Sequence, residues 1–200
     1  MSSESPSELA SRICHQIAAV FSAQTTHHPP ALEVLIAELT ALSLRKGRAF
    51  LYGVGREGLM MRAFCMRLFH LGLPVHLVFD MTTPPIGSED LLIASAGPGG
   101  FSTVDAICGV ARSAGARVLL LTAQPEGGSS LRYATAVAHV PAQTMADDGG
   151  EGRVGSRQVL PMGSVYEGAL FVLFEMAVYK LGEALGETPE AIRCRHTNLE

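Results

Sequence analysis

The chain has 200 residues, of which 48% are hydrophobic, and this is enough for one domain with a complete core. Its formal net charge is −4 and its basic residues are scattered along the sequence, which excludes the basic surface of a protein that binds nucleic acid or an anionic membrane. The four cysteines have neither metal-binding nor disulfide-scaffold spacing, so we expect reduced thiols in a cytoplasmic protein.

The first 46 residues predict two amphipathic helices, over 7–23 and 30–44, because apolar side chains recur on one face of each. We expect this helical hairpin to pack on the domain formed by residues 47–200 or on a partner subunit. His27 and His28 lie between the helices, where a solvated pair is the ordinary case, and we predict no metal site. Neither an export signal nor a membrane span is expected, since Glu175 and Lys180 interrupt the most apolar late stretch.

From residue 48 onward, apolar runs alternate with segments of helical periodicity. Strands are predicted over 48–54, 75–79, 91–95, 118–122 and 136–140, and helices over 59–71, 102–115, 129–133, 164–185 and 189–195. This alternation predicts an α/β fold of three layers, with a doubly wound five-stranded parallel sheet in flavodoxin-like order 2-1-3-4-5. Residues 145–157 are glycine-rich and acidic, which is typical of a mobile lid or of a disordered loop.

Two glycine-bearing turns follow the first and third predicted strands, at 53–58 and 95–100. Each precedes a helix, so its backbone N–H groups lie at the positive end of a helix dipole and can bind an anion. Two such turns at the carboxyl ends of strands predict a crevice for a phosphorylated small molecule. The candidate binding residues are Gly53, Gly55, Arg56 and Glu57 in the first turn, and Ser95, Gly97, Gly99, Gly100, Ser102 and Thr103 in and after the second.

The first turn also fits a second type of site. Gly53-x-Gly55-x-x-Gly58 has the spacing of the dinucleotide fingerprint, and Asp80 follows at the end of the second strand, where a ribose-binding acid is expected. Against this interpretation, the sheet leaves few residues to present a substrate to a nicotinamide ring.

The sequence resembles the sugar isomerase (SIS) domain family, and within it the 6-phospho-3-hexuloisomerases. The resemblance covers nearly everything from Gly47 onward. It is carried by Gly53–Gly72, Thr83–Ile86, Asp90–Ala94, Arg157–Gly163 with Glu167, and the terminus Arg195–Glu200. It implies a homotetramer of SIS folds that interconverts 3-hexulose 6-phosphate and fructose 6-phosphate, with neither a metal nor an organic cofactor.

The chain departs from the family pattern in both turns. Members usually have a serine where this chain has Glu57, and a Ser-Gly-Ser-Gly-Glu-Thr run where it has 96–101. The second turn therefore lacks hydroxyls, although N–H donors remain at its glycines. A carboxylate at 57 repels a phosphate dianion by about 4 kcal/mol per pair of unit charges at 4 Å and an effective dielectric of 20. Only Arg56 or a rotamer that turns away can offset this repulsion.

The resemblance also implies two catalytic residues. Isomerisation through an enediol needs a base, and Glu167 stands where the family's proposed base lies, although Ser164-x-x-Glu167 is also a capping-box pattern. In the family, the histidine matching His196 reaches into a neighbouring subunit's crevice and assists ring opening; the alternative is a lone surface histidine. A phosphosugar isomerase is the first interpretation, and a non-catalytic sugar-phosphate-binding module is the second.

Overall fold

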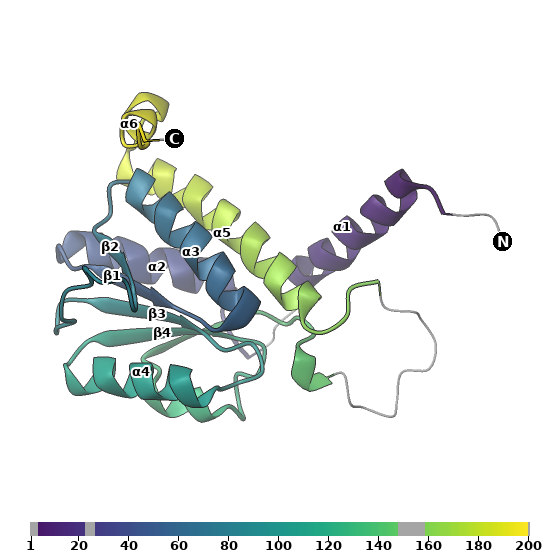
Figure 1. Ribbon diagram of the computed structural model, residues 1–200, viewed down its shortest axis with the longest axis horizontal. Coiled ribbons are helices and arrows are strands. Elements are labelled where there is room, and N and C mark those ends of the chain that lie inside the picture. Colours follow the sequence, from purple (N-terminus) through teal and green to yellow (C-terminus); the bar gives the residue numbers. More distant parts are fainter. Residues whose placement is uncertain (1–3, 23–26, 148–158, 200) are drawn as a thin grey trace.

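The computed structural model describes residues 4–22, 27–147 and 159–199, and a parallel sheet lies at its centre (Figure 1). The strands are β1 (Ala49–Tyr52), β2 (Val75–Leu77), β3 (Leu91–Ser95), β4 (Arg117–Thr122) and β5 (Ala136–His139). They lie in the order β2-β1-β3-β4-β5 and every pairing is parallel, which confirms the predicted sheet.

Helices cover both faces of this sheet and complete the three layers. On one face lie α2 (Ala31–Leu44), α3 (Gly55–His70) and α5 (Ser164–Leu185); on the other lie α4 (Ser102–Ser113) and the 3-10 helix η1 (Ser129–Tyr133) (Figure 1). Three further elements are α1 (Pro6–Ser22), which contacts α5, the 3-10 turn η2 (Met145–Asp147), and α6 (Pro189–Cys194) at the far end of α5.

Alternate residues of the central strands enter different cores. On β3, Leu91 and Ile93 join the cluster under α2, α3 and α5, whereas Leu92 and Ala94 join the cluster under α4. Successive side chains of a strand point to opposite faces, so a strand covered on both faces must be apolar throughout. This explains the continuous apolar runs that marked β3 and β4 in the sequence.

Two predicted boundaries at the carboxyl edge of the sheet are wrong. Helix α3 begins at Gly55 instead of Leu59, because the glycine turn is itself the first turn of the helix, with the Gly58 N–H donating to Val54 O. Strand β2 ends at Leu77 instead of Phe79, because Phe79 takes a left-handed φ of 76° in the turn that follows.

Ser102-x-x-Asp105 and Ser164-x-x-Glu167 both have the spacing of a capping box, with Asp in place of Glu in the first, but neither forms one. Helix α4 begins without a side-chain cap, and Asp105 is buried and accepts a hydrogen bond from Ser130 on η1. At α5 the cap position is Gly163, with a φ of 80°, and glycine has no side-chain acceptor that could cap the helix. Glu167 is therefore not held by helix capping.

Three predictions stay untested. Of the loop at 145–157, the part from 148 onward lies outside the described residues, so its proposed lid role cannot be compared with the structure. The division between residues 1–46 and 47–200 also stays a prediction, as does the placement of the hairpin on a partner. Within the described ranges, no helix is long and apolar enough to cross a membrane.

Candidate active site

The turns after β1 and β3 meet the start of α5 at the carboxyl edge of the sheet. Between them lies a cavity of about 20 Å³, which is room for roughly one water molecule. Side chains at its mouth must move to admit a hexose phosphate. Its lining residues come from all three segments and from the chain around η2: Glu57, Pro98, Thr144, Met145, Met162, Gly163, Tyr166 and Glu167.

Glu57 reaches from the first turn across to the second. Its carboxylate accepts a hydrogen bond from Ser95 Oγ at 2.5 Å and from the Gly97 N–H, whose nitrogen lies 3.1 Å from Oε2. Only 7% of the residue is exposed. From the sequence we expected this carboxylate to lie beside the N–H groups of the first turn. In the structure it points inward and accepts hydrogen bonds from the second turn.

Glu167 lies on the first turn of α5 and faces the same cavity. Arg56 Nη1 lies 2.8 Å from its Oε2 as an ion pair and donates a hydrogen bond to Ser164 Oγ. Oε2 is buried and, among the described residues, has no hydrogen-bond partner. It is thus a carboxylate oxygen with an unused lone pair at the cavity.

Burial raises the pKa values of the acidic groups around the cavity. It raises the pKa of Glu167 above its usual value, while the Arg56 guanidinium acts in the opposite direction. It also raises the pKa of Glu57, which the hydrogen bonds from Ser95 and Gly97 lower and the negative charge of Glu167 raises further. Two carboxyl groups whose charges interact therefore share one small, poorly hydrated space.

Tyr166 closes the inner wall of the site. Burial raises its pKa well above the ordinary value, with the Glu57 charge adding to the effect, so the phenol stays neutral. Its hydroxyl lies 3.4 Å from Ser95 Oγ. A Cβ placed on Gly97 would lie 2.9 Å from the tyrosine ring and 3.1 Å from Glu57 Oε1, so only glycine fits between them.

The other predicted binding residues lie outside this cluster. Gly99 and Gly100 pack against Gly128 and Ser129, and the Gly99 N–H donates to Ala96 O, so this donor is used within the turn. Ser102 and Thr103 are exposed at the start of α4 and do not line the cavity. Gly53 and Gly58 approach each other closely: a Cβ on Gly58 would lie 2.6 Å from Gly53 O.

His196 is not near Glu167 in the same chain. It follows α6, and its ring stacks on His70 at the end of α3, with the ring centroids 5.2 Å apart. Glu167 is at the opposite end of α5, roughly 27 Å away along the helix axis at 1.5 Å per residue (Figure 1). Any role for His196 in this reaction requires the site of another subunit.

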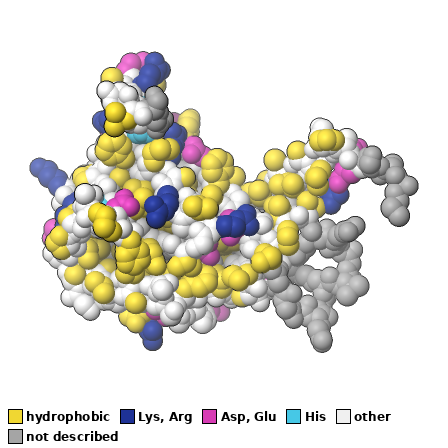
Figure 2. All heavy atoms as spheres, viewed as in Figure 1, with side chains coloured by type: hydrophobic (Ala, Val, Ile, Leu, Met, Phe, Trp, Pro, Cys, Tyr) yellow, Lys and Arg dark blue, Asp and Glu magenta, His cyan; other side chains and the backbone are white. Residues whose placement is uncertain are grey.

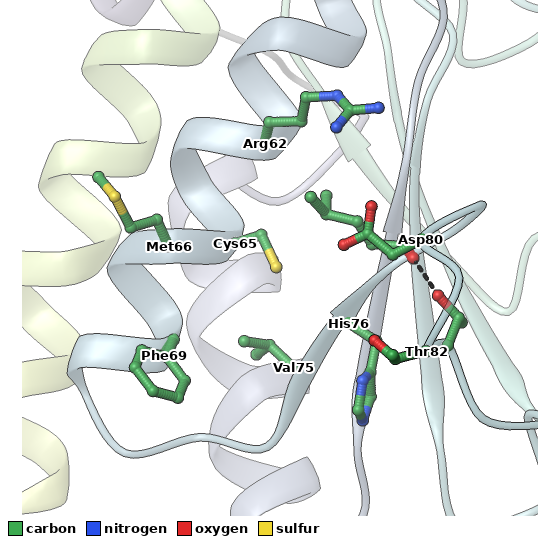
Figure 3. A pocket seen from close by; sticks show the side chains of 10 residues that line it. Arg62, Cys65, Met66, Phe69, Val75, His76, Asp80 and Thr82 are labelled. Atoms are coloured by element: carbon green, nitrogen blue, oxygen red, sulfur yellow. Dashed lines mark hydrogen bonds between the residues drawn. The ribbon is translucent and has the colours of Figure 1, made fainter. Parts of the chain in front are cut away.

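Asp80, the acid of the dinucleotide interpretation, lies beside the flank of α3 and lines a second cavity of about 300 Å³ (Figure 3). Its carboxylate points toward the helix, near Arg62 and Cys65, and its charge adds to burial in raising the pKa of the Cys65 thiol to about 11. An acid directed at the middle of α3 does not face the glycine turn at its start, which removes the geometric basis for a ribose contact.

Sequence reasoning missed two residues of the site. Ser164 was interpreted as a helix cap but accepts from Arg56, and Tyr166 gave no signal, since an aromatic residue in an apolar helix is ordinary core. Among the described residues there is no group of three or more His, Cys, Asp or Glu side chains that could hold a metal ion.

Comparison with known proteins leads to the same family that the sequence resembles. No family model matches the chain. The 3-hexulose-6-phosphate isomerase of Mycobacterium gastri is 38% identical over 165 residues, covering 82% of this chain and 80% of that protein. The enzyme of the same name from Bacillus subtilis is 31% identical over 157 residues, covering 78% of this chain and 82% of that protein.

Solved structures share the fold. A Methanococcus jannaschii protein, for which a 3-hexulose-6-phosphate isomerase function was inferred, has a TM-score of 0.75 at 23% identity, covering 96% of this chain and 99% of that one. The Vibrio vulnificus NanR protein complexed with ManNAc-6P has a TM-score of 0.68 at 14% identity, covering 94% of this chain and 67% of that one. With the sequence relatives, these likenesses show that the chain belongs to the 3-hexulose-6-phosphate isomerase family and has the fold of the SIS phosphosugar isomerases.

Proposed function

We propose that this protein is a phosphosugar isomerase that interconverts 3-hexulose 6-phosphate and fructose 6-phosphate through an enediol. Its relatives in Mycobacterium gastri and Bacillus subtilis bear the name of that activity. The observation that carries the proposal is Glu167: a carboxylate at a cavity between the two glycine turns, with a raised pKa and an oxygen that pairs with Arg56 but accepts no hydrogen bond from the described residues.

The chemistry needs one base that serves two adjacent carbons. Glu167 removes the proton from C2 of the 3-ketose while O3 gains a proton, which gives the 2,3-enediol. It then returns its proton to C3 while O2 loses one, which gives the 2-ketose. A carboxyl with a raised pKa suits both steps, since it is a stronger base as the anion and still a competent acid when protonated.

We place the phosphate group at the first turn. The N–H groups of Gly55, Arg56 and Glu57 belong to the first turn of α3, where no intrahelical acceptor exists, and Arg56 adds a positive charge beside them. A protein of the same fold is bound to ManNAc-6P, which supports a sugar phosphate as the ligand class. The remaining predicted binding residues, Gly53 and those of the second turn, shape the crevice around the phosphate.

Replacing Glu167 by Gln tests the assignment of the base. Turnover of fructose 6-phosphate should fall by about 10²–10⁴-fold, the usual contribution of a general base, while the affinity for the sugar phosphate changes little. Glu175→Gln is the matched control, because it makes the same change on an exposed part of the same helix, where the side chain only pairs with Arg67. An active Glu167→Gln enzyme would disprove the role of Glu167.

We further propose that the protein works as a homo-oligomer, a dimer or the homotetramer that the resemblance implies, with His196 entering a neighbour's site. Each of the four cysteines is a free thiol, which fits the reducing cytoplasm.

An alternative function is a non-catalytic sugar-phosphate-binding module, which the occupation of the second turn by Glu57 favours. Ligand-dependent thermal stabilisation without any isomerase activity would distinguish this module from the enzyme.

A further inference from the structure

Two donors of the second turn bond to a side chain of the same molecule. Gly97 N–H and Ser95 O–H, which point to the place where an anion would lie, both donate to Glu57. The Gly99 N–H bonds within the turn, and Pro98 has no N–H. A carboxylate therefore stands where these groups would otherwise bind an external anion.

This carboxylate is enclosed without a neutralising charge. Within the described ranges no Arg, Lys or His forms an ion pair with Glu57; the nearest arginine in sequence, Arg56, pairs with Glu167. From the second turn Glu57 is faced by Ser95 and Gly97, and from α5 by Tyr166 and the like charge of Glu167. Burying a carboxylate this way is costly, so the position is held by its two hydrogen bonds and by packing.

We propose that Glu57 is a built-in anion that occupies the second turn and excludes a ligand's phosphate from it while its carboxylate is ionised. Glu57 is then a specificity-determining residue: a sugar phosphate must bind without the Ser95 and Gly97 donors, or wait until Glu57 is protonated or displaced. The identity of the ligand rests on the proposed function, but the exclusion of anions does not.

If Glu57 excludes anions while it is ionised, the affinity for an anion should depend on pH. Because burial raises the pKa of Glu57, this group gains its proton at a higher pH than an exposed glutamate does. A neutral carboxyl no longer repels an anion, so affinity should rise as the pH falls. Phosphate itself gains a proton near pH 6, whereas sulfate remains a dianion, which makes sulfate the cleaner probe.

Calorimetric titration of the wild type, Glu57→Gln and Glu57→Ser with sulfate, fructose 6-phosphate and fructose tests this inference. At neutral pH both variants should bind sulfate and fructose 6-phosphate at least about tenfold more tightly than the wild type, while fructose binding changes little. The advantage of the variants should shrink toward acid pH. Glu183→Gln, an exposed change at the other end of α5, should behave as the wild type.

Equal or weaker sulfate binding by both folded variants would overturn the proposal. If neither variant folds, as judged by circular dichroism and thermal melting, the wild type alone still decides: sulfate affinity that does not rise toward acid pH contradicts exclusion by Glu57. Failure of the proposed function appears separately, as absent isomerase turnover, and leaves the sulfate result unaffected.

Discussion

Arg56 sets the balance of charge at Glu167. Burial of Glu167 and the guanidinium 2.8 Å from its Oε2 act on the pKa in opposite directions, and burial is the larger effect. The side chain of Arg56 is 58% exposed, so water weakens its contribution. The arginine therefore offsets part of the effect of burial on the pKa of Glu167, the proposed base.

Replacing Arg56 by Ala should raise the pKa of Glu167 further. A base must be ionised to act, so the acid limb of the pH–kcat profile should move to higher pH. Arg56→Lys should move it less. An acid limb that moves to lower pH, or stays in place in both variants, contradicts control of the base by Arg56.

For single residues, the sequence singled out candidates for the site but could not reveal their contacts. It singled out Glu57 and Glu167, but the partners of Glu57 are 38 and 40 residues away in the chain, and no local pattern reveals which turn a side chain enters. The Ser164-x-x-Glu167 pattern suggested a capping box, yet Gly163 in a left-handed conformation takes the cap position. Only tertiary packing decides such competitions.

Asp90 joins the starts of β1 and β3 at the edge opposite the site. Its carboxylate accepts from the backbone N–H of Arg48, from the Arg48 guanidinium at 2.7 Å, and from the Gly87 N–H at 2.8 Å. It is 3% exposed. Although burial raises its pKa, these hydrogen bonds outweigh burial and hold the pKa of Asp90 below its usual value.

Asp90→Ala should therefore destabilise the fold by about 2–3 kcal/mol at neutral pH, since it removes charge-assisted hydrogen bonds and leaves buried donors unpaired. That loss lowers the melting temperature by roughly 4–12 °C for a chain of this size. A group with a depressed pKa stabilises above its unfolded value, about 3.9, and this gain disappears as the pH falls through the folded value. Melting curves should accordingly converge below about pH 4; a constant difference would contradict the linkage.

Elements with a clear apolar period were predicted almost to the residue, as β3 and α5 show, because burial on one or both faces dictates the pattern. The start of α3 was not, because glycines at 55 and 58 are poor helix formers and indicate a loop. Glycine at 58 has a steric reason: the turn brings strand and helix so close that a Cβ at 58 would lie 2.6 Å from Gly53 O.

The surface of the whole molecule is suited to self-association. Hydrophobic side chains run along α1, which extends away from the body (Figure 2). Leu9 and Phe21 on this helix are exposed, as are Phe171 and Tyr179 on α5. Exposed apolar side chains of this kind are typical of a contact surface, and the role proposed above for His196 needs a second copy of the chain as the partner.

Mixing two inactive proteins tests this arrangement. One is Glu167→Gln with its terminus intact; the other retains Glu167 but lacks residues 196–200. If each site combines Glu167 of one subunit with His196 of another, random reassembly should restore about a quarter of the sites. Mixed oligomers without recovered activity, or a monomer in sedimentation velocity, would contradict the shared site. The sequence alone could not decide this question, because subunit contacts leave no periodic signal distinct from that of a core.

The close approach of Gly53 and Gly58 has a consequence for genome surveys. Gly53 and Gly58 are crowded at a sharp strand-to-helix junction and Gly55 has a left-handed φ of 55°, and any protein of similar architecture faces these demands whatever it binds. Scans that accept three glycines in the nucleotide fingerprint spacing will collect sugar-phosphate proteins as false positives. A scan should also require that the downstream acidic side chain face the glycine turn. Asp80 does not face it, so this requirement removes such false positives.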